Sequence, residues 1–163
     1  MAMRVTKEDV WAGDLSDIPG GLARVLEALG GARASLDCVI ARRRPDRPGS
    51  GVVFVTPVSA ARVQQAAREA GLSPAADVAT LRVEGADKPG LGGRVTRAVA
   101  DAGVNLRGLS AAVLGTKFVA YLGFDSQADA DKAMAAIKAL DAARPAAKAR
   151  AKRPAAGRGR AKR

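Results

Sequence analysis

The chain lacks most of the residues on which enzyme and metal chemistry depend. Its 163 residues contain no histidine and a single cysteine, Cys38. A zinc site of the usual Cys/His kind therefore has no ligand set, an internal disulfide has no second thiol, and serine–histidine or cysteine–histidine catalysis has no base. We expect a protein that is not an enzyme, with no catalytic residue, no metal and no cofactor.

Aromatic residues and long apolar runs are also scarce. Aromatics make up 3% of the chain and hydrophobic residues 48%, so the core must be built from Ala, Val, Leu and Ile. No apolar run approaches the roughly 18 residues that a membrane-spanning helix needs. The first nine residues contain no apolar stretch of the secretory-signal kind. We expect a cytoplasmic protein with no membrane partner.

Acidic residues are missing from one end of the chain. The net charge is +11, and residues 142–163 hold nine basic residues and no acid, which leaves 18 basic against 16 acidic residues elsewhere. This predicts a near-neutral globular body and a disordered basic tail that resembles histone-H1-like tails. Such a tail would bind DNA or RNA electrostatically and associate the protein with the nucleoid, or it is a solubilising extension with no dedicated partner. The tail residues expected to contact phosphates are Lys148, Arg150, Lys152, Arg153, Arg158, Arg160, Lys162 and Arg163.

The body contains an internal repeat. The turn at 17–22 reads Asp-Ile-Pro-Gly-Gly-Leu, the turn at 87–92 reads Asp-Lys-Pro-Gly-Leu-Gly, and Pro89 lies 70 residues after Pro19. Each turn follows a strand pattern and precedes an apolar pattern at helical spacing. We therefore divide the chain into a first repeat at 1–77, a second repeat at 78–141 and the tail at 142–163.

Hydrophobic periodicity and turn residues predict the elements of both repeats. For the first repeat they give a βαββαβ order, with Ser59 placed to cap the second helix and Gly71 to end it. The elements expected there are at 10–15, 22–29, 35–41, 51–55, 60–70 and 72–76. The strand at 51–55 is apolar on both faces and reads as buried. The polar loop 42–51 precedes it.

The second repeat is expected to lack its last strand. Strands are predicted at 78–84, 104–113 and 118–124, and helices at 91–102 and 126–140. No strand follows the last helix, because the basic tail begins there. We predict that the segment around residues 3–6 fills this place, or that a second chain does, so that the repeats form one interdependent α+β body.

The turns and the segments after them resemble the ACT domain, an amino-acid-binding regulatory domain. The second repeat has Asp-x-Pro-Gly at 87–90 and Ala-Gly-Val-Asn-Leu at 102–106, and the first has a degenerate copy at 17–22 and 33–36. The resemblance covers residues 10–140. It implies two ferredoxin-like βαββαβ repeats with antiparallel sheets, and a non-catalytic homodimer that senses a free amino acid at ACT–ACT interfaces.

The resemblance also implies which residues would contact the ligand. Exposed amides at Gly90, Gly92 and Gly93, together with the helix dipole, favour a carboxylate. Asp87 can accept a hydrogen bond from an ammonium group, and the Asn105 amide can both donate and accept. The ligand-binding positions are Asp87, Lys88, Gly90, Leu91, Gly92, Asn105 and Leu106 in the second repeat, and Asp17, Gly20, Gly21 and Ser35 in the first. Because Ser35 replaces the asparagine, the second repeat is the better candidate.

Other interpretations of the same residues stand beside this one. Pro-Gly at a helix start is also ordinary turn chemistry, and Gly92 and Gly93 can serve close packing alone. The alternative function is a nucleic-acid-associated protein whose tail binds DNA or RNA while the body only dimerises it. Cys38 and Trp11 are each better explained by packing than by chemistry.

Two nucleotide-binding interpretations fail on the residues. A dinucleotide fingerprint at 90–95 would need Gly or Ala where Val95 stands, and no acid ends the next strand. An RNA-recognition sheet needs exposed aromatics on its central strands. Phe118 and Phe124 instead share a strand face with Ala120 and Leu122, which is typical of a core.

Overall fold

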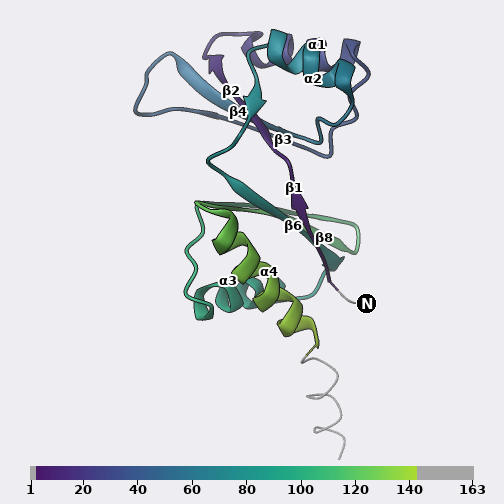
Figure 1. Cartoon of the computed structure of the whole chain (residues 1–163), viewed down its shortest axis with the longest axis vertical. Helices are drawn as coiled ribbons and strands as arrows, with labels where there is room; N and C mark the ends of the chain where they lie inside the picture. The colour runs from purple at the N-terminus through teal and green to yellow at the C-terminus, as the bar shows by residue number, and fades with distance from the viewer. Residues whose placement is uncertain (1–2, 143–163) are drawn as a thin grey trace, which may run out of the picture.

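The computed structural model describes residues 3–142, which form two lobes (Figure 1). Each lobe is a four-stranded antiparallel sheet with two helices on one face, and the strand orders are β3-β4-β2-β5 and β1-β6-β8-β7. When the second order is written in reverse, as β7-β8-β6-β1, the two sheets match strand for strand, and β1 takes the place that β5 has in the first sheet. This confirms the predicted fold class of two ferredoxin-like repeats. Apart from Ala142, the predicted tail and its basic residues lie outside the described residues.

The first sheet and its helices follow the expected order. The elements are β2 (Trp11–Ser16), α1 (Gly21–Gly31), β3 (Cys38–Arg43), β4 (Ser50–Thr56), α2 (Ala61–Glu69) and β5 (Ser73–Pro74). The predicted boundaries of β3 are wrong, because pairing with β4 continues to Arg43 opposite Gly51 and shortens the polar loop.

The predicted cap of α2 is also wrong. Its N-cap is Ala60, and no side chain caps the helix. The Gln64 amide instead reaches back and donates to the carbonyls of Val58 and Ser59 at 3.3 and 3.4 Å. A side chain from inside the helix thus satisfies the carbonyls that precede it, and Ser59 contributes only its backbone.

The second sheet has the elements β6 (Ala79–Ala86), α3 (Leu91–Asp101), β7 (Gly108–Leu114), β8 (Lys117–Phe124) and α4 (Gln127–Ala142). Ser126 caps α4, since its hydroxyl accepts a hydrogen bond from the Asp129 amide at 3.1 Å. The predicted start of β7 at residue 104 is wrong. The Val104 amide still donates to Val99 at the end of α3, and pairing with β8 begins only at Gly108. Asn105 therefore lies in a loop.

The missing strand of the second repeat comes from the start of the chain. β1 (Arg4–Glu8) pairs antiparallel with β6, from Arg4 opposite Glu84 to Glu8 opposite Thr80. Val5 is 8% exposed and belongs to the core of the second lobe. This confirms that the N-terminal segment fills the sheet edge. The segment 1–77 is consequently shared between the two lobes.

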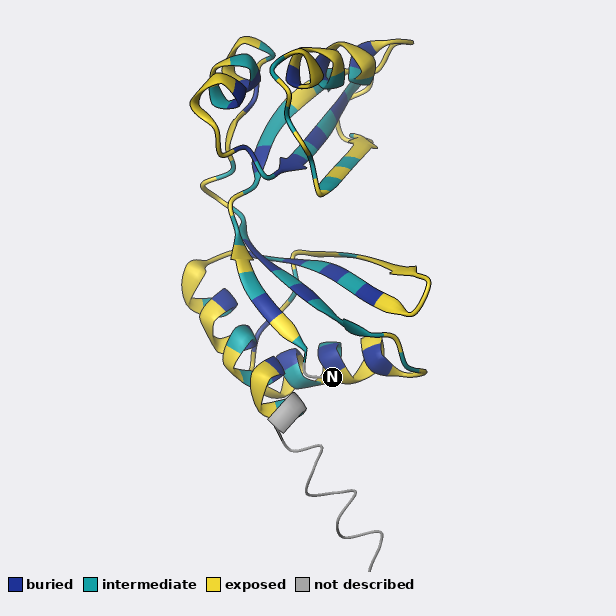
Figure 2. Ribbon diagram, turned by 90° about the vertical axis from the view of Figure 1, so that its right-hand side faces the viewer, coloured by how far each residue is buried: buried dark blue, intermediate teal, exposed yellow. Residues whose placement is uncertain are grey.

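Each lobe has its own core between its sheet and its helices. Figure 2 shows the buried positions as dark bands along the strands and on the inner faces of the helices. Trp11 is 4% exposed, and the Arg68 guanidinium lies 5.3 Å from its ring centroid, so it is a packing residue as expected. Phe118, Leu122 and Phe124 are buried in the second core, which confirms their assignment. No helix within residues 3–142 is long and apolar enough to cross a membrane.

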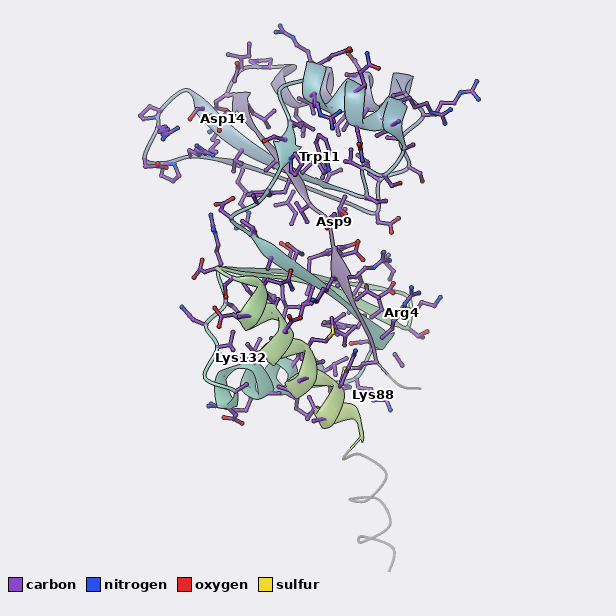
Figure 3. The ribbon with its side chains drawn as sticks, viewed as in Figure 1. Arg4, Asp9, Trp11, Asp14, Lys88 and Lys132 are labelled. Atoms are coloured by element: carbon purple, nitrogen blue, oxygen red, sulfur yellow. The ribbon has the colours of Figure 1, made fainter. Side chains whose placement is uncertain are left out.

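The helices lie on the outer sides of the molecule and the two sheets turn their open faces toward each other (Figure 1). The chain crosses between the lobes at residues 9–10 and again at 75–78. One hydrogen bond joins the crossings, from the Ala75 amide to the Val10 carbonyl at 2.9 Å, and the Thr56 hydroxyl at the end of β4 donates to the Asp9 carbonyl at 3.0 Å. Figure 3 shows Asp9 at this junction.

Candidate functional site

The two Asp-x-Pro-Gly turns have the same backbone. Gly20 and Gly90 are the N-caps of α1 and α3, with φ of 85° and 76°, in the left-handed region that favours glycine. In each turn the amide after this glycine donates a hydrogen bond of 3.0 Å to the carbonyl three residues earlier, from Gly21 to Ile18 and from Leu91 to Lys88. Neither helix has a side-chain cap. The repeated sequence therefore does produce a repeated local structure.

The turn of the second repeat is open to solvent. A Cβ atom added at Gly90, Gly92 or Gly93 would meet no atom within 4 Å. Asp87 is exposed, and its carboxylate has no hydrogen-bond or ion-pair partner among the described residues, although its amide donates to the Thr116 carbonyl at 2.8 Å. Uncovered amides at the positive end of a helix dipole thus lie beside a free carboxylate, which suits a ligand with both charges.

The turn of the first repeat is occupied by the protein itself. The Arg43 Nε donates to the Asp17 carboxylate at 3.0 Å, so this carboxylate already has a cation. Gly21 is buried, and a Cβ there would lie 2.3 Å from the Ser16 carbonyl oxygen. Turn geometry and close packing alone account for Gly20 and Gly21. The first turn is therefore less suited to a ligand.

The structure does not bring Asp87 and Asn105 together within one chain. Asp87 lies at the outer end of the second sheet, next to the β7–β8 turn, whereas the Arg107 amide donates to Gly123 at the inner end. At about 3.3 Å per residue along β6, these ends are roughly 20 Å apart. Figure 3 shows the same separation, with Lys88 at the outer end and Asp9 at the junction.

The other predicted positions follow the same division. Ser35 lies near the inner end of the first sheet, where the Asp37 amide donates to the Thr56 carbonyl, and Asp17 lies at the outer end beside Gly49. Leu91 and Leu106 pack in the core of the second lobe and Lys88 is half-buried. A site that combines Asp87 with Asn105 therefore needs a second copy of the chain.

Sequence reasoning missed a cavity between the two open sheet faces. Its volume is about 200 Å³, and it is lined from the first sheet by Ile40 and Phe54, among others, and from the second by Thr80, Ser110 and Tyr121. The signal was present in β4, whose run at 52–55 is apolar on both faces. An antiparallel strand of that kind has something covering its second face. Here the cover is the other lobe.

Two titratable side chains of this cleft stay protonated at neutral pH. Burial raises the pKa of the Cys38 thiol, with a further increase from Asp37 that Arg82 opposes. Burial likewise raises the pKa of the Tyr121 hydroxyl. A neutral thiol reacts only slowly with electrophiles, which agrees with the expectation that Cys38 is a packing residue and not a catalytic nucleophile. The Tyr121 hydroxyl keeps its proton and can donate a hydrogen bond.

An ionic bridge joins the lobes beside the cleft. Arg82 on β6 donates to the carboxylate of Asp37 in the first lobe, and to Glu84 on its own strand at 2.7 Å. The same guanidinium lies 5.8 Å from the ring centroid of Tyr121. Arg82 Nε is buried without a hydrogen-bond partner among the described residues. Arg82 thus ties the open face of the second sheet to the strand that carries Cys38.

The comparisons with known proteins bear on the fold. No family model and no curated protein matches the chain. Among solved structures, the chain is similar to the ligand-free regulatory subunit of aspartate kinase from Thermus thermophilus, at 19% identity and a TM-score of 0.59 over 84% of this chain and 95% of that one. It is also similar to protein BT0572 from Bacteroides thetaiotaomicron, at 12% identity and a TM-score of 0.70 over 83% and 90%.

A third similarity is to a much longer chain. Aspartate kinase from Synechocystis matches at 17% identity and a TM-score of 0.58, over 86% of this chain and 27% of the kinase. At these identities the likeness concerns the fold alone. The chain has the predicted α+β fold with two four-stranded antiparallel sheets, and the likeness to the regulatory subunit extends along nearly the whole length of that subunit.

Proposed function

We propose that this chain is a non-catalytic regulatory protein that binds a free amino acid at a junction between ACT units, through the turn at the start of α3. The observation that carries the proposal is the pairing of a free Asp87 carboxylate with the uncovered backbone at Gly90, Gly92 and Gly93. The α-carboxylate of the ligand binds the amides, and its α-ammonium binds Asp87. A regulatory role is supported by the fold shared with regulatory subunits of aspartate kinase.

The distance between Asp87 and Asn105 favours a homodimer. β7 is an edge strand of the second sheet, and three of its side chains, Leu109, Val113 and Leu114, are 41%, 49% and 73% exposed. Antiparallel pairing of β7 with the same strand of a second copy covers these side chains and the free backbone groups of the edge. It also brings the Asn105 end of one copy to the Asp87 end of the other, which completes the site.

A thermal-shift screen with the standard amino acids tests the binding. We expect one amino acid, or a small group of similar ones, to raise the melting temperature of the 163-residue protein. Asp87→Asn should weaken that ligand at least tenfold without loss of folding, because Asp87 is exposed and unpaired. Asp17→Asn is the matched control and should leave affinity unchanged. If no amino acid shifts the wild-type protein, or if Asp87→Asn responds as the wild type does, the proposal is wrong.

The dimer has a separate test. Val113→Arg places a charge on the β7 edge, near the end of the strand, and should convert the dimer to a monomer in light scattering, with loss of the amino-acid response. Thr96→Arg, on the outer helix α3 and away from β7, controls for the added charge. A wild-type monomer that still binds the amino acid would contradict the shared site.

A further inference from the structure

We propose that the cleft between the two open sheet faces is a second binding site, for a small carboxylate that has an apolar body and no positive charge. The cleft lies near the junction of the lobes, whereas the helix-start turns lie at the outer ends of the sheets. The two sites therefore do not overlap.

The shape and walls of the cleft set the size and character of the occupant. Its volume of about 200 Å³ is smaller than the roughly 300–1,000 Å³ of pockets for drug-sized molecules, so the occupant is a small molecule. Ile40 and Phe54 contribute apolar surface from the first sheet, and Val78 and Leu109 contribute it from the second side. Removing an apolar body from water against these walls favours binding.

Three hydroxyl groups of the cleft have unused hydrogen-bonding capacity. Thr80, Ser110 and Tyr121 lie on the second sheet, and none of their hydroxyls bonds to any described residue. Thr80 is only 9% exposed, and Ser110 is the cross-strand partner of Tyr121. These hydroxyls line the cleft and can each donate to, or accept from, a polar group of an occupant.

The charges around the cleft select an anion. Arg42 and Arg107 line it, and no carboxylate does. The Arg107 guanidinium is already held by Asp77 through bonds of 2.6 and 2.7 Å, whereas the Arg42 guanidinium has no ion pair or hydrogen bond with any described residue. Of the acids near the cleft, Asp37 and Glu84 are bound to Arg82, and Glu8, whose charge also acts on Tyr121, accepts a hydrogen bond from Thr6.

A ligand carboxylate therefore finds a free guanidinium and hydroxyl donors, while a ligand ammonium finds no carboxylate among the described residues that line the cleft. This excludes the zwitterionic amino acids that the Asp87 turn suits. It also gives the cleft a regulatory consequence, because an occupant touches both lobes and holds them in one relative position.

Cys38 provides a direct readout of occupancy. It lines the cleft, is half-buried and is the sole cysteine of the chain, so the rate of alkylation by iodoacetamide reports access to this one place. The probes are 4-methylpentanoate and 3-phenylpropanoate, which have the skeletons of leucine and phenylalanine without the amino group. We expect at least one of them to slow alkylation by fivefold or more at saturation, and leucine, phenylalanine and the two uncharged carboxamides to have little effect.

Variants assign the effect to the cleft. Arg42→Gln should raise the concentration for half-protection at least tenfold, whereas Arg47→Gln, an equal loss of charge in the exposed β3–β4 loop, should leave it unchanged. Asp87→Asn should also leave it unchanged, which separates this site from the proposed amino-acid site. The proposal is overturned if neither carboxylate protects Cys38, if Arg42→Gln is protected like the wild type, or if the amino acids protect as well as the carboxylates do.

Discussion

The two repeats share a fold and a turn but differ in how each is completed. In the first, Arg43 forms an ion pair with the Asp17 carboxylate, and the residue after the turn glycine is Gly21, which packs against the Ser16 carbonyl. In the second, Asp87 is free and the matching residue is Leu91, which belongs to the core. The comparison shows that one sequence motif can be a structural device in one copy and an open surface in the other.

The sheet edges differ in the same way. The first sheet ends in β5, which pairs with β2 at two positions, and the second ends in β1, which pairs with β6 at five positions and buries Val5. The second repeat therefore depends on a strand from the far end of the chain.

The largest expected effect tests this dependence. Deleting residues 1–8 removes β1, exposes the β6 edge and uncovers the second core. Burial of a valine contributes about 1.5–3 kcal/mol, and the strand also carries the ladder bonds, so we expect a loss of at least about 3 kcal/mol in urea unfolding. Ser73→Gly in β5 should cost no more than about 1 kcal/mol. Equal losses in the two variants would show that the edges are equivalent.

Leu91→Ala tests the core contribution of the second turn. Leu91 is 4% exposed, and truncating a buried leucine leaves a cavity that costs about 2–5 kcal/mol. We expect this loss in chemical denaturation, with the α3 helix intact by circular dichroism. A loss below about 1 kcal/mol would mean that the second turn is not anchored in its core.

Gly21→Ala tests the matching position of the first turn. The new Cβ would lie 2.3 Å from the Ser16 carbonyl oxygen, so the backbone must move, at a cost of about 1–3 kcal/mol. Gly30→Ala in the same helix meets no atom within 4 Å and should stabilise by about 0.5–1 kcal/mol. If both substitutions stabilise the protein, Gly21 is not required by packing.

Arg43→Gln removes the partner of Asp17. Because Arg43 is 83% exposed, this ion pair should contribute no more than about 1 kcal/mol to the free energy of unfolding. The expected result is a nearly unchanged urea midpoint. A shift as large as that of Gly21→Ala would show that the ion pair holds the first turn in place.

The smallest effect is a pH dependence at the start of the second repeat. A hydrogen bond from Arg107 lowers the pKa of Asp77. A carboxyl with a lower pKa in the folded state stabilises the fold above its unfolded pKa, near 3.9, and loses that contribution as pH falls through the folded pKa. Asp77→Asn should therefore be slightly less stable than the wild type at pH 6 and equal to it once the pH lies below both the folded and the unfolded pKa of Asp77. A difference that persists at low pH would contradict the ion-pair explanation.

Much of the fold could be predicted because its signals are local. Alternation identified β6 and β8, helical spacing identified α1 and α3, and the basic tail after α4 implied that another segment must complete the second sheet. The errors, in the cap of α2 and the start of β7, came from local signals as well. Ser59 has the side chain of a cap, but α2 begins one residue later, with Ala60 as its N-cap and no side-chain cap. The apolar residues after Gly103 look like a strand, but pairing with β8 begins only at Gly108.

The sequence by itself determined the two turns, since a Pro-Gly pair with glycine in the left-handed region specifies its own backbone. Only the tertiary structure decided what each turn can do. Whether a carboxylate is free depends on the strand that passes beside it, and the separation of Asp87 from Asn105 depends on the length of a sheet. The cleft around Ile40 and Tyr121 depends on two lobes meeting. These relations join residues far apart in the chain, and strand pairing and packing create them.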